Sequence, residues 1–192
     1  MLKRLLKEYE YYLKITKGLS LNSIYSYVTD LKEYVEFLEK NYGIKDPNDI
    51  TKQHVRNFIA RLKRKHNTPS SISRKMSAIR SFHKYMLLEK LVQHNISLGL
   101  SLPKKQKKLP VVLSVEEVDA LMVAADGDEP LDLRNKAMIE LLYGCGLRIS
   151  ELLDLKLSDL HINMWFINVY GKGNKERIVP IGFEAAYALK QY

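Results

Sequence analysis

A basic segment that contains prolines divides the sequence into two parts. Residues 98–112 (LGLSLPKKQKKLPVV) hold two prolines, one glycine and four lysines, a composition typical of a connector. We therefore expect two separately folded domains, over residues 1–97 and 113–192. An extended basic connector suits a protein that wraps around a duplex, because the connector can itself cross the phosphate backbone. Lys104 and Lys105 are the candidate backbone contacts within it.

The net charge of +9 is concentrated before the second domain. Residues 1–112 hold 23 lysines and arginines against 9 acidic residues, whereas residues 113–192 hold 8 against 13. Within residues 51–108, Glu89 is the single acidic residue beside 15 basic ones. A solvated helix face explains this excess less well than a polyanionic partner does. RNA, DNA and an anionic membrane surface are all open at this step.

The cysteine and the histidines limit which disulfide and metal sites the chain can form. Cys145 is the only cysteine, which excludes an internal disulfide and suits a reducing cytoplasm. It lies between two glycines among apolar residues, so we interpret it as a packing residue. Because no histidine stands at metal-ligand spacing from Cys145 or from another histidine, we expect no metal site. The sequence has no apolar run of membrane-spanning length and no signal-peptide core at its start, so we expect no membrane partner.

Apolar spacing and helix-capping residues predict a bundle of four helices in the first domain. The first spans residues 2–17, and the last spans residues 69–88. Their predicted ends are marked by glycines, capping hydroxyls and one proline: Gly18, Ser20, Gly43, Thr51, Thr68 and Pro69.

The helix over residues 69–88 has two contrasting faces. One is an apolar stripe of Ile72, Met76, Ile79, His83 and Met86. The other carries small hydroxyls and cations: Ser70, Ser77, Ser81, Arg74 and Lys84, with Arg80 on its flank. Small hydroxyls let a helix axis approach a DNA groove while the long cations reach phosphates or guanine edges. A serine-rich helix that only faces solvent is the alternative, and the charge distribution favours DNA contact.

The second domain combines helices with a β-hairpin. A capping box formed by Ser114 and Glu117 begins one helix, and a later helix is broken at residues 144–146. The apolar period then changes to two, with Trp165, Ile167 and Val169 alternating before a turn at residues 171–174 and a returning strand. The predicted fold class is therefore mainly α with a small β-hairpin or sheet: a helical bundle followed by a mixed α+β unit.

Two cations in this domain are candidate site residues. Arg148 lies in the first turn of a short helix, where the helix dipole disfavours a cation. An anion such as a phosphate, bound by both Arg148 and the free amides of the helix, would explain a cation at this position. An ordinary ion pair with Glu151 or Asp154 would explain it as well, and the residues alone favour neither. We interpret Glu151 as a structural partner of Arg148 or of the local backbone. Lys172 lies between two glycines at the predicted hairpin tip, at a spacing that excludes a P-loop.

Four stretches resemble the tyrosine recombinase (phage integrase) family, most closely its Xer-type members. SLNSIYSYVTDLKEYVEFL and TPSSISRKMSAIRSFHKYM resemble the helical core-binding domain. LYGCGLRISELLDLKLSDL and VYGKGNKERIVPI resemble the first two catalytic motifs in sequence, order and spacing. The resemblance covers the whole chain. It implies a core-binding domain over residues 1–97 and the first part of a catalytic domain over residues 113–192.

The resemblance implies that DNA strands are cleaved and rejoined through a 3′-phosphotyrosyl link, without metal or cofactor. Arg148 matches an arginine that neutralises the phosphoryl oxygens, and Lys172 matches the general acid that protonates the leaving 5′-oxygen. The DNA-facing positions of the family are matched by Arg74, Arg80 and Lys84. The implied partners are double-stranded DNA and other recombinase protomers on the same DNA site.

The sequence departs from the family pattern at the nucleophile. Family members carry a His-x-x-Arg motif and a nucleophilic tyrosine well beyond the hairpin lysine. Here no histidine is followed by arginine three residues later, and Tyr192 lies where the family has a mid-domain helix. We therefore expect a truncated recombinase that binds duplex DNA without cleaving it, and whose uncovered second domain is marginally stable or self-associates.

Two other functions would use the same basic domain. The first is that of a natural short DNA-binding protein that occupies recombination sites and regulates an intact recombinase. The second, an unrelated helical transcription regulator, leaves both catalytic motifs unexplained.

Overall fold

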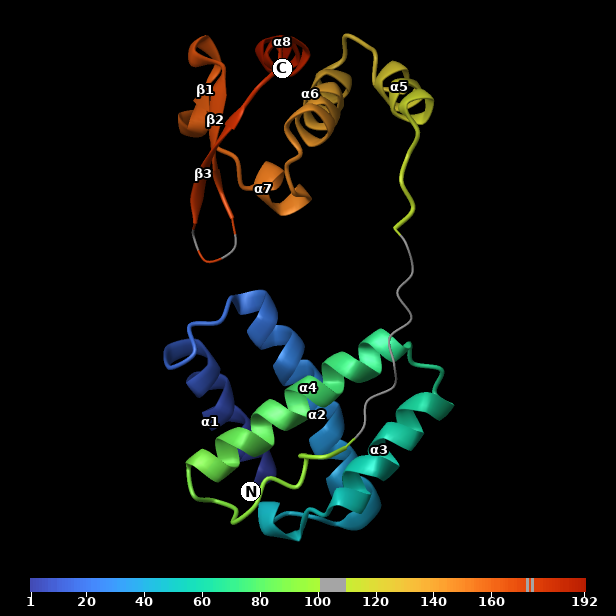
Figure 1. The fold of residues 1–192 in the computed structure, drawn as a ribbon, viewed down its shortest axis with the longest axis vertical. Helices are drawn as coiled ribbons and strands as arrows, with labels where there is room; N and C mark the ends of the chain where they lie inside the picture. The colour runs from blue at the N-terminus through green and yellow to red at the C-terminus, as the bar shows by residue number, and fades with distance from the viewer. Residues whose placement is uncertain (101–109, 172, 174) are drawn as a thin grey trace. The chain divides into compact units, whose positions relative to one another are not determined.

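The computed structural model describes residues 1–100, 110–171, 173 and 175–192, and the chain divides into two compact units (Figure 1). The first unit is Met1–Lys108 and the second is Leu109–Tyr192. The described residues are mainly helical, with one small antiparallel sheet in the second unit. The predicted fold class is confirmed.

Four helices build the first unit over the residues that the structure describes. They are α1 (Leu2–Ile15), α2 (Leu21–Tyr42), α3 (Lys52–Arg64) and α4 (Pro69–Leu88), with a 3-10 turn, η1 (Pro47–Asp49), between α2 and α3. Gly43 ends α2 in the left-handed conformation (φ 67°), which glycine adopts without steric cost. At the start of α4 the Thr68 hydroxyl accepts a hydrogen bond from the Ser71 amide at 3.2 Å. These helix ends lie where the capping residues predict them.

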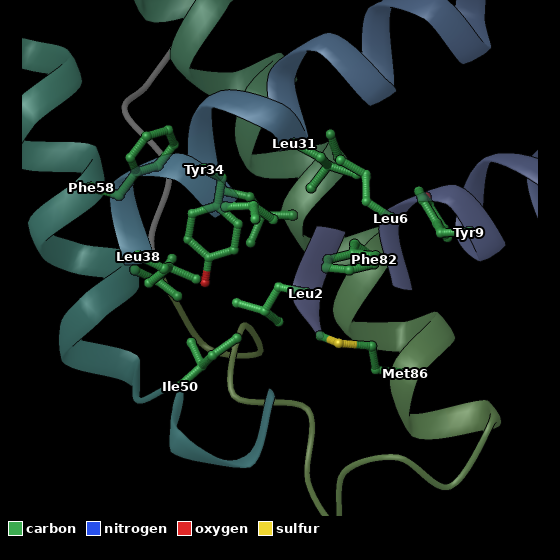
Figure 2. Packing of buried hydrophobic residues seen from close by; sticks show 14 of the residues in the cluster. Leu2, Leu6, Tyr9, Leu31, Tyr34, Leu38, Ile50, Phe58, Phe82 and Met86 are labelled. Atoms are coloured by element: carbon green, nitrogen blue, oxygen red, sulfur yellow. The ribbon is translucent and has the colours of Figure 1, made fainter. Parts of the chain in front are cut away.

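One hydrophobic core lies between these four helices (Figure 2). Each helix contributes a fully buried aromatic ring, and the rings meet in two pairs. Tyr9 packs against Phe82, and Tyr34 packs against Phe58, with ring centroids 5.2 Å apart in both pairs. The predicted apolar stripe of α4 is entirely buried here: Ile72, Met76, Ile79, His83 and Met86. The core extends to Leu100, past the predicted domain end at residue 97.

The described part of the second unit contains four helices. They are α5 (Val115–Ala124), α6 (Pro130–Cys145), α7 (Ile149–Leu153) and α8 (Phe183–Gln191), with 3-10 turns η2 (Leu157–Asp159) and η3 (Ile162–Met164). The predicted capping box is present, since the Ser114 hydroxyl accepts from the Glu117 amide at 3.2 Å and the Glu117 carboxylate accepts from the Ser114 amide at 2.8 Å. The predicted break between α6 and α7 occurs at Gly146, which is left-handed (φ 61°).

The sheet has three antiparallel strands in the order β1-β2-β3: β1 (Leu160–His161), β2 (Phe166–Tyr170) and β3 (Glu176–Pro180). The predicted hairpin is β2–β3, with Ile167 opposite Val179 and Val169 opposite Arg177. Ile167 and Val169 are buried against Leu141 and other residues of the second core. Trp165 was wrongly included in the alternation, because it precedes β2 in a left-handed conformation and is half exposed.

Two features are absent from the described part of the chain. None of its helices is both long and apolar enough to span a lipid bilayer. Within the same residues, no three His, Cys, Asp or Glu side chains are grouped so that they would hold a metal ion.

Candidate functional site

Arg148, Glu151 and Arg177 form one ion-pair cluster in the second unit. Arg148 is the N-cap of α7; its amide donates to Glu151 Oε2 at 2.9 Å and its Nη1 donates to Glu151 Oε1 at 2.7 Å. Arg177 on β3 binds the same carboxylate with Nη1 at 2.7 Å and Nη2 at 2.9 Å. The Glu151 side chain is buried. A single buried carboxylate therefore fixes two guanidinium groups.

The charges of this cluster leave Arg148 able to bind an anion. Hydrogen bonds from Arg177 and from the Arg148 amide hold the pKa of Glu151 far below its usual range, so Glu151 is ionised. One carboxylate faces two guanidinium groups, which leaves an excess of positive charge. The Arg148 side chain is 72% exposed, whereas that of Arg177 is 38% exposed. Arg148 is thus the member of the cluster that solvent, or a phosphate, reaches most readily.

The beginning of the β2–β3 turn packs directly on this cluster. Gly171 follows β2, and its amide donates to the Lys175 carbonyl at 2.8 Å. A Cβ atom at residue 171 would lie 3.3 Å from Glu151 Oε1 and 3.6 Å from Arg177 Nη1, so a larger residue would press on the ion pairs. Glycine therefore allows this close approach. The predicted general acid, Lys172, is the next residue and lies outside the described residues.

The structure shows which of the two acidic residues near Arg148 is its ion-pair partner. Its acidic partner is Glu151 and not Asp154, and it lies just before α7 as the N-cap instead of within the first turn. The structural role predicted for Glu151 is confirmed. Cys145 packs against the second core, and burial raises the pKa of its thiol, which makes it a poor nucleophile.

Arg177 was not among the predicted site residues. It is 26 positions from Glu151 in the sequence, and the alternating pattern of a strand carries no information about a helix packed nearby. The available signal was chemical: a carboxylate placed in an apolar region beside an exposed arginine needs a further cation if it is to be buried.

The predicted polar face of α4 is the outer face of the helix, except that Ser81 does not belong to it, because Ser81 is half buried and accepts a hydrogen bond from the Tyr9 hydroxyl at 2.7 Å. Ser70, Arg74, Ser77 and Lys84 are exposed and follow one another at helical spacing. Arg80 is half buried on the flank, and its guanidinium donates to the backbone carbonyl of Leu100. Four of the described candidates are therefore open to solvent on one face, and Arg80 is tied to the end of the same unit. The other two candidates, Lys104 and Lys105, lie outside the described residues.

The fold is that of integrases. A lambda integrase dimer bound to a COC′ core site superposes with a TM-score of 0.75, covering 99% of this chain and 68% of that chain at 17% identity. A Tn1549 transposon integrase in complex with transposon right end DNA gives 0.72, covering 97% and 64% at 17% identity. At such low identity these likenesses establish the fold alone.

Sequence comparison is more specific. The models of the phage integrase N-terminal SAM-like domain and of the phage integrase family match residues 6–90 and 111–192. The tyrosine recombinase XerD of Halalkalibacterium halodurans is 43% identical over 97% of this chain and 62% of that protein. The tyrosine recombinase XerC of Anoxybacillus flavithermus is 41% identical over 94% and 60%. The chain belongs to the phage integrase family of tyrosine recombinases, and it spans about three fifths of the length of these relatives.

Proposed function

We propose that this chain acts in site-specific DNA recombination. In this proposal the outer face of α4 binds duplex DNA, and the second unit supplies part of a site that breaks and rejoins phosphodiesters. The observation that carries the proposal is Arg148, an exposed guanidinium held in place by Glu151 in a chain of this family. A rigid, permanently charged fork suits two oxygens of one phosphate.

The site residues of the second unit have distinct proposed roles. Arg148 neutralises the charge that grows on the non-bridging oxygens while a nucleophile attacks phosphorus. Glu151 and Arg177 are positioning residues, because they hold Arg148 in one orientation before the substrate arrives. Lys172 is the proposed general acid for the leaving 5′-oxygen, on the strength of its motif. The nucleophile in this chemistry is a tyrosine hydroxyl, which gives a 3′-phosphotyrosyl link that a 5′-hydroxyl later reverses.

The proposed partners follow from the same chemistry. They are duplex DNA and further recombinase protomers on one DNA site, in the cytoplasm. None of the histidines in the printed sequence is followed by arginine at the third position, and Tyr192 has no such motif before it. We therefore propose that the 192-residue polypeptide by itself binds DNA without cleaving it. A covalent adduct trapped on a nicked duplex would contradict this part of the proposal.

DNA binding is tested by fluorescence anisotropy with a labelled duplex over a series of salt concentrations. The logarithm of the affinity should fall linearly with the logarithm of salt, by about 0.9 for each phosphate contact. Lys84→Ala should weaken binding and reduce that slope by about 1. The matched control is Lys7→Ala, which removes an exposed lysine from α1 and should leave the slope unchanged. Binding that is absent or independent of salt, or equal effects of the two variants, would contradict the proposal.

A further inference from the structure

A buried carboxylate of α2 contacts α4, the helix proposed to bind DNA. Asp30 is 2% exposed and accepts hydrogen bonds from two consecutive residues of α4. Arg74 Nη1 binds Asp30 Oδ2, and Lys75 Nζ lies 3.1 Å from Asp30 Oδ1. A buried carboxylate is unfavourable unless it is paired, so Asp30 requires these cations.

The two cations have different relations to solvent. Lys75 is 12% exposed and also binds Glu33 Oε2 at 2.7 Å, so its charge is neutralised within the protein. Arg74 is 47% exposed, although it contacts the same carboxylate. Of Asp30, Arg74 and Lys75, Arg74 alone extends from the buried carboxylate to the outer surface.

The contacts of Arg74 involve one end of its guanidinium. Nη1 donates to Asp30 and to the backbone carbonyl of Ser26 at 3.4 Å. Among the hydrogen bonds of the described residues, none uses Arg74 Nε or Nη2. A guanidinium carries five N–H donors in one rigid plane, so fixing Nη1 also fixes the direction of the Nε–Nη2 edge. That edge offers two parallel donors, the geometry that binds two phosphate oxygens.

We propose that Asp30 is a positioning residue that holds Arg74 so that its Nε–Nη2 edge binds one phosphate of duplex DNA. The inference rests on the DNA contact proposed for the outer face of α4. A free arginine side chain loses rotamer freedom when it binds, and the contact with Asp30 removes that loss in advance. The negative charge of Asp30 acts against phosphate binding. Positioning and charge therefore affect DNA affinity with opposite signs.

Because positioning and charge change DNA affinity in opposite directions, a pair of variants can distinguish them. Asp30→Ala and Glu33→Ala each remove one carboxylate from the same cluster and one acceptor from Lys75, but only Asp30 contacts Arg74. If charge alone matters, both variants of the full chain bind duplex DNA more tightly. If Asp30 positions Arg74, Glu33→Ala binds at least as tightly as the unchanged chain, and Asp30→Ala binds roughly threefold to tenfold more weakly. Anisotropy at one fixed salt concentration measures both.

A double variant separates positioning from stability. With Arg74→Ala in place, Asp30→Ala has no side chain to position, so only the charge effect is left: DNA affinity should stay the same or rise, while the melting temperature still falls. The positioning role is overturned if Asp30→Ala changes DNA affinity equally with and without Arg74, or if the Asp30→Ala single variant binds DNA as tightly as Glu33→Ala. Either result leaves the proposed DNA contact itself standing. If the unchanged chain binds no DNA, the proposed DNA contact and this inference both fail.

A measurement on the unchanged chain covers the case in which Asp30→Ala does not fold. The Nε–Hε group of Arg74 can be followed by heteronuclear NMR relaxation without DNA. Positioning requires that this group be as rigid as the α4 backbone. A freely rotating Arg74 side chain overturns the proposal.

Discussion

The carboxylate of Glu151 accepts two parallel hydrogen bonds from Arg177, from Nη1 to Oε1 at 2.7 Å and from Nη2 to Oε2 at 2.9 Å. This bidentate pair links α7 to β3 and fixes the plane of the carboxylate as well as its position. Because Arg148 binds the same carboxylate, its orientation depends on the packing of the sheet against α7. The geometry of the candidate phosphate site therefore belongs to the folded second unit and not to the short helix alone.

Replacing Glu151 by Gln should destabilise the second unit at neutral pH and much less in acid. The arginines hold the pKa of Glu151 below its usual value of about 4.3, so its ionised form stabilises the fold above that pH. The contribution is lost as pH falls from there toward the lower pKa of the folded state. Thermal unfolding should show a difference in melting temperature at about pH 7 that narrows toward about pH 3.

The matched control for Glu151→Gln is Asp154→Asn, which removes an exposed carboxylate at the end of the same helix. This variant should melt at nearly the same temperature as the unchanged chain at both pH values. A difference between Glu151→Gln and the unchanged chain that did not depend on pH would show that the ionised carboxylate is not what stabilises the cluster.

His83 should make the first unit sensitive to acid. It is buried in the core, and its Nε2 lies 3.2 Å from the hydroxyl oxygen of Tyr34. Burial lowers the pKa of His83 to about 4, so between that value and about 6.5 the unfolded chain binds the proton and the folded chain does not. Stability therefore falls as pH is lowered through this window, by about 3 kcal/mol between pH 7 and pH 4.

The acid sensitivity is measured by urea unfolding, followed through NMR signals of the first unit in the full chain. His83→Gln keeps a polar side chain that does not titrate, so it should lose less stability than the unchanged chain over the same pH range. Parallel losses in the two proteins would mean that His83 is not the responsible group.

Two neighbouring residues of α4 should differ in their effect on stability. Phe82 is fully buried against Tyr9, and Phe82→Ala should destabilise the first unit by about 3–5 kcal/mol because it leaves a cavity. Ser81 accepts a hydrogen bond from the Tyr9 hydroxyl at 2.7 Å, and Ser81→Ala should cost about 1 kcal/mol. Urea unfolding of both variants measures the difference. Similar losses would indicate that α4 is not packed as the structure shows.

The features that were predicted from sequence depend on residues close together in the chain. The cap at Thr68 and the two faces of α4 follow from spacings of three and four residues. The contact between Asp30 and Arg74 joins positions 44 apart, and local periodicity contains no such information. Strand β1 is two residues long, too short to show an alternating pattern. The family motif indicated Arg148, whereas Arg177 becomes a site residue only when β3 packs beside α7.

Exposed apolar side chains should make the second unit self-associate. A groove of about 540 Å³ is lined by residues of α6, α7, η2 and α8, and Leu157, one of the lining residues, is 88% exposed. Apolar surface of this kind is removed from water when two copies meet. Sedimentation velocity of the full chain should therefore show a species distribution that shifts with concentration, and Leu157→Lys should reduce the shift. Tyr25→Lys, which changes an exposed side chain of α2, is the control and should not. A chain that stays monomeric at all concentrations would show that this surface does not drive association.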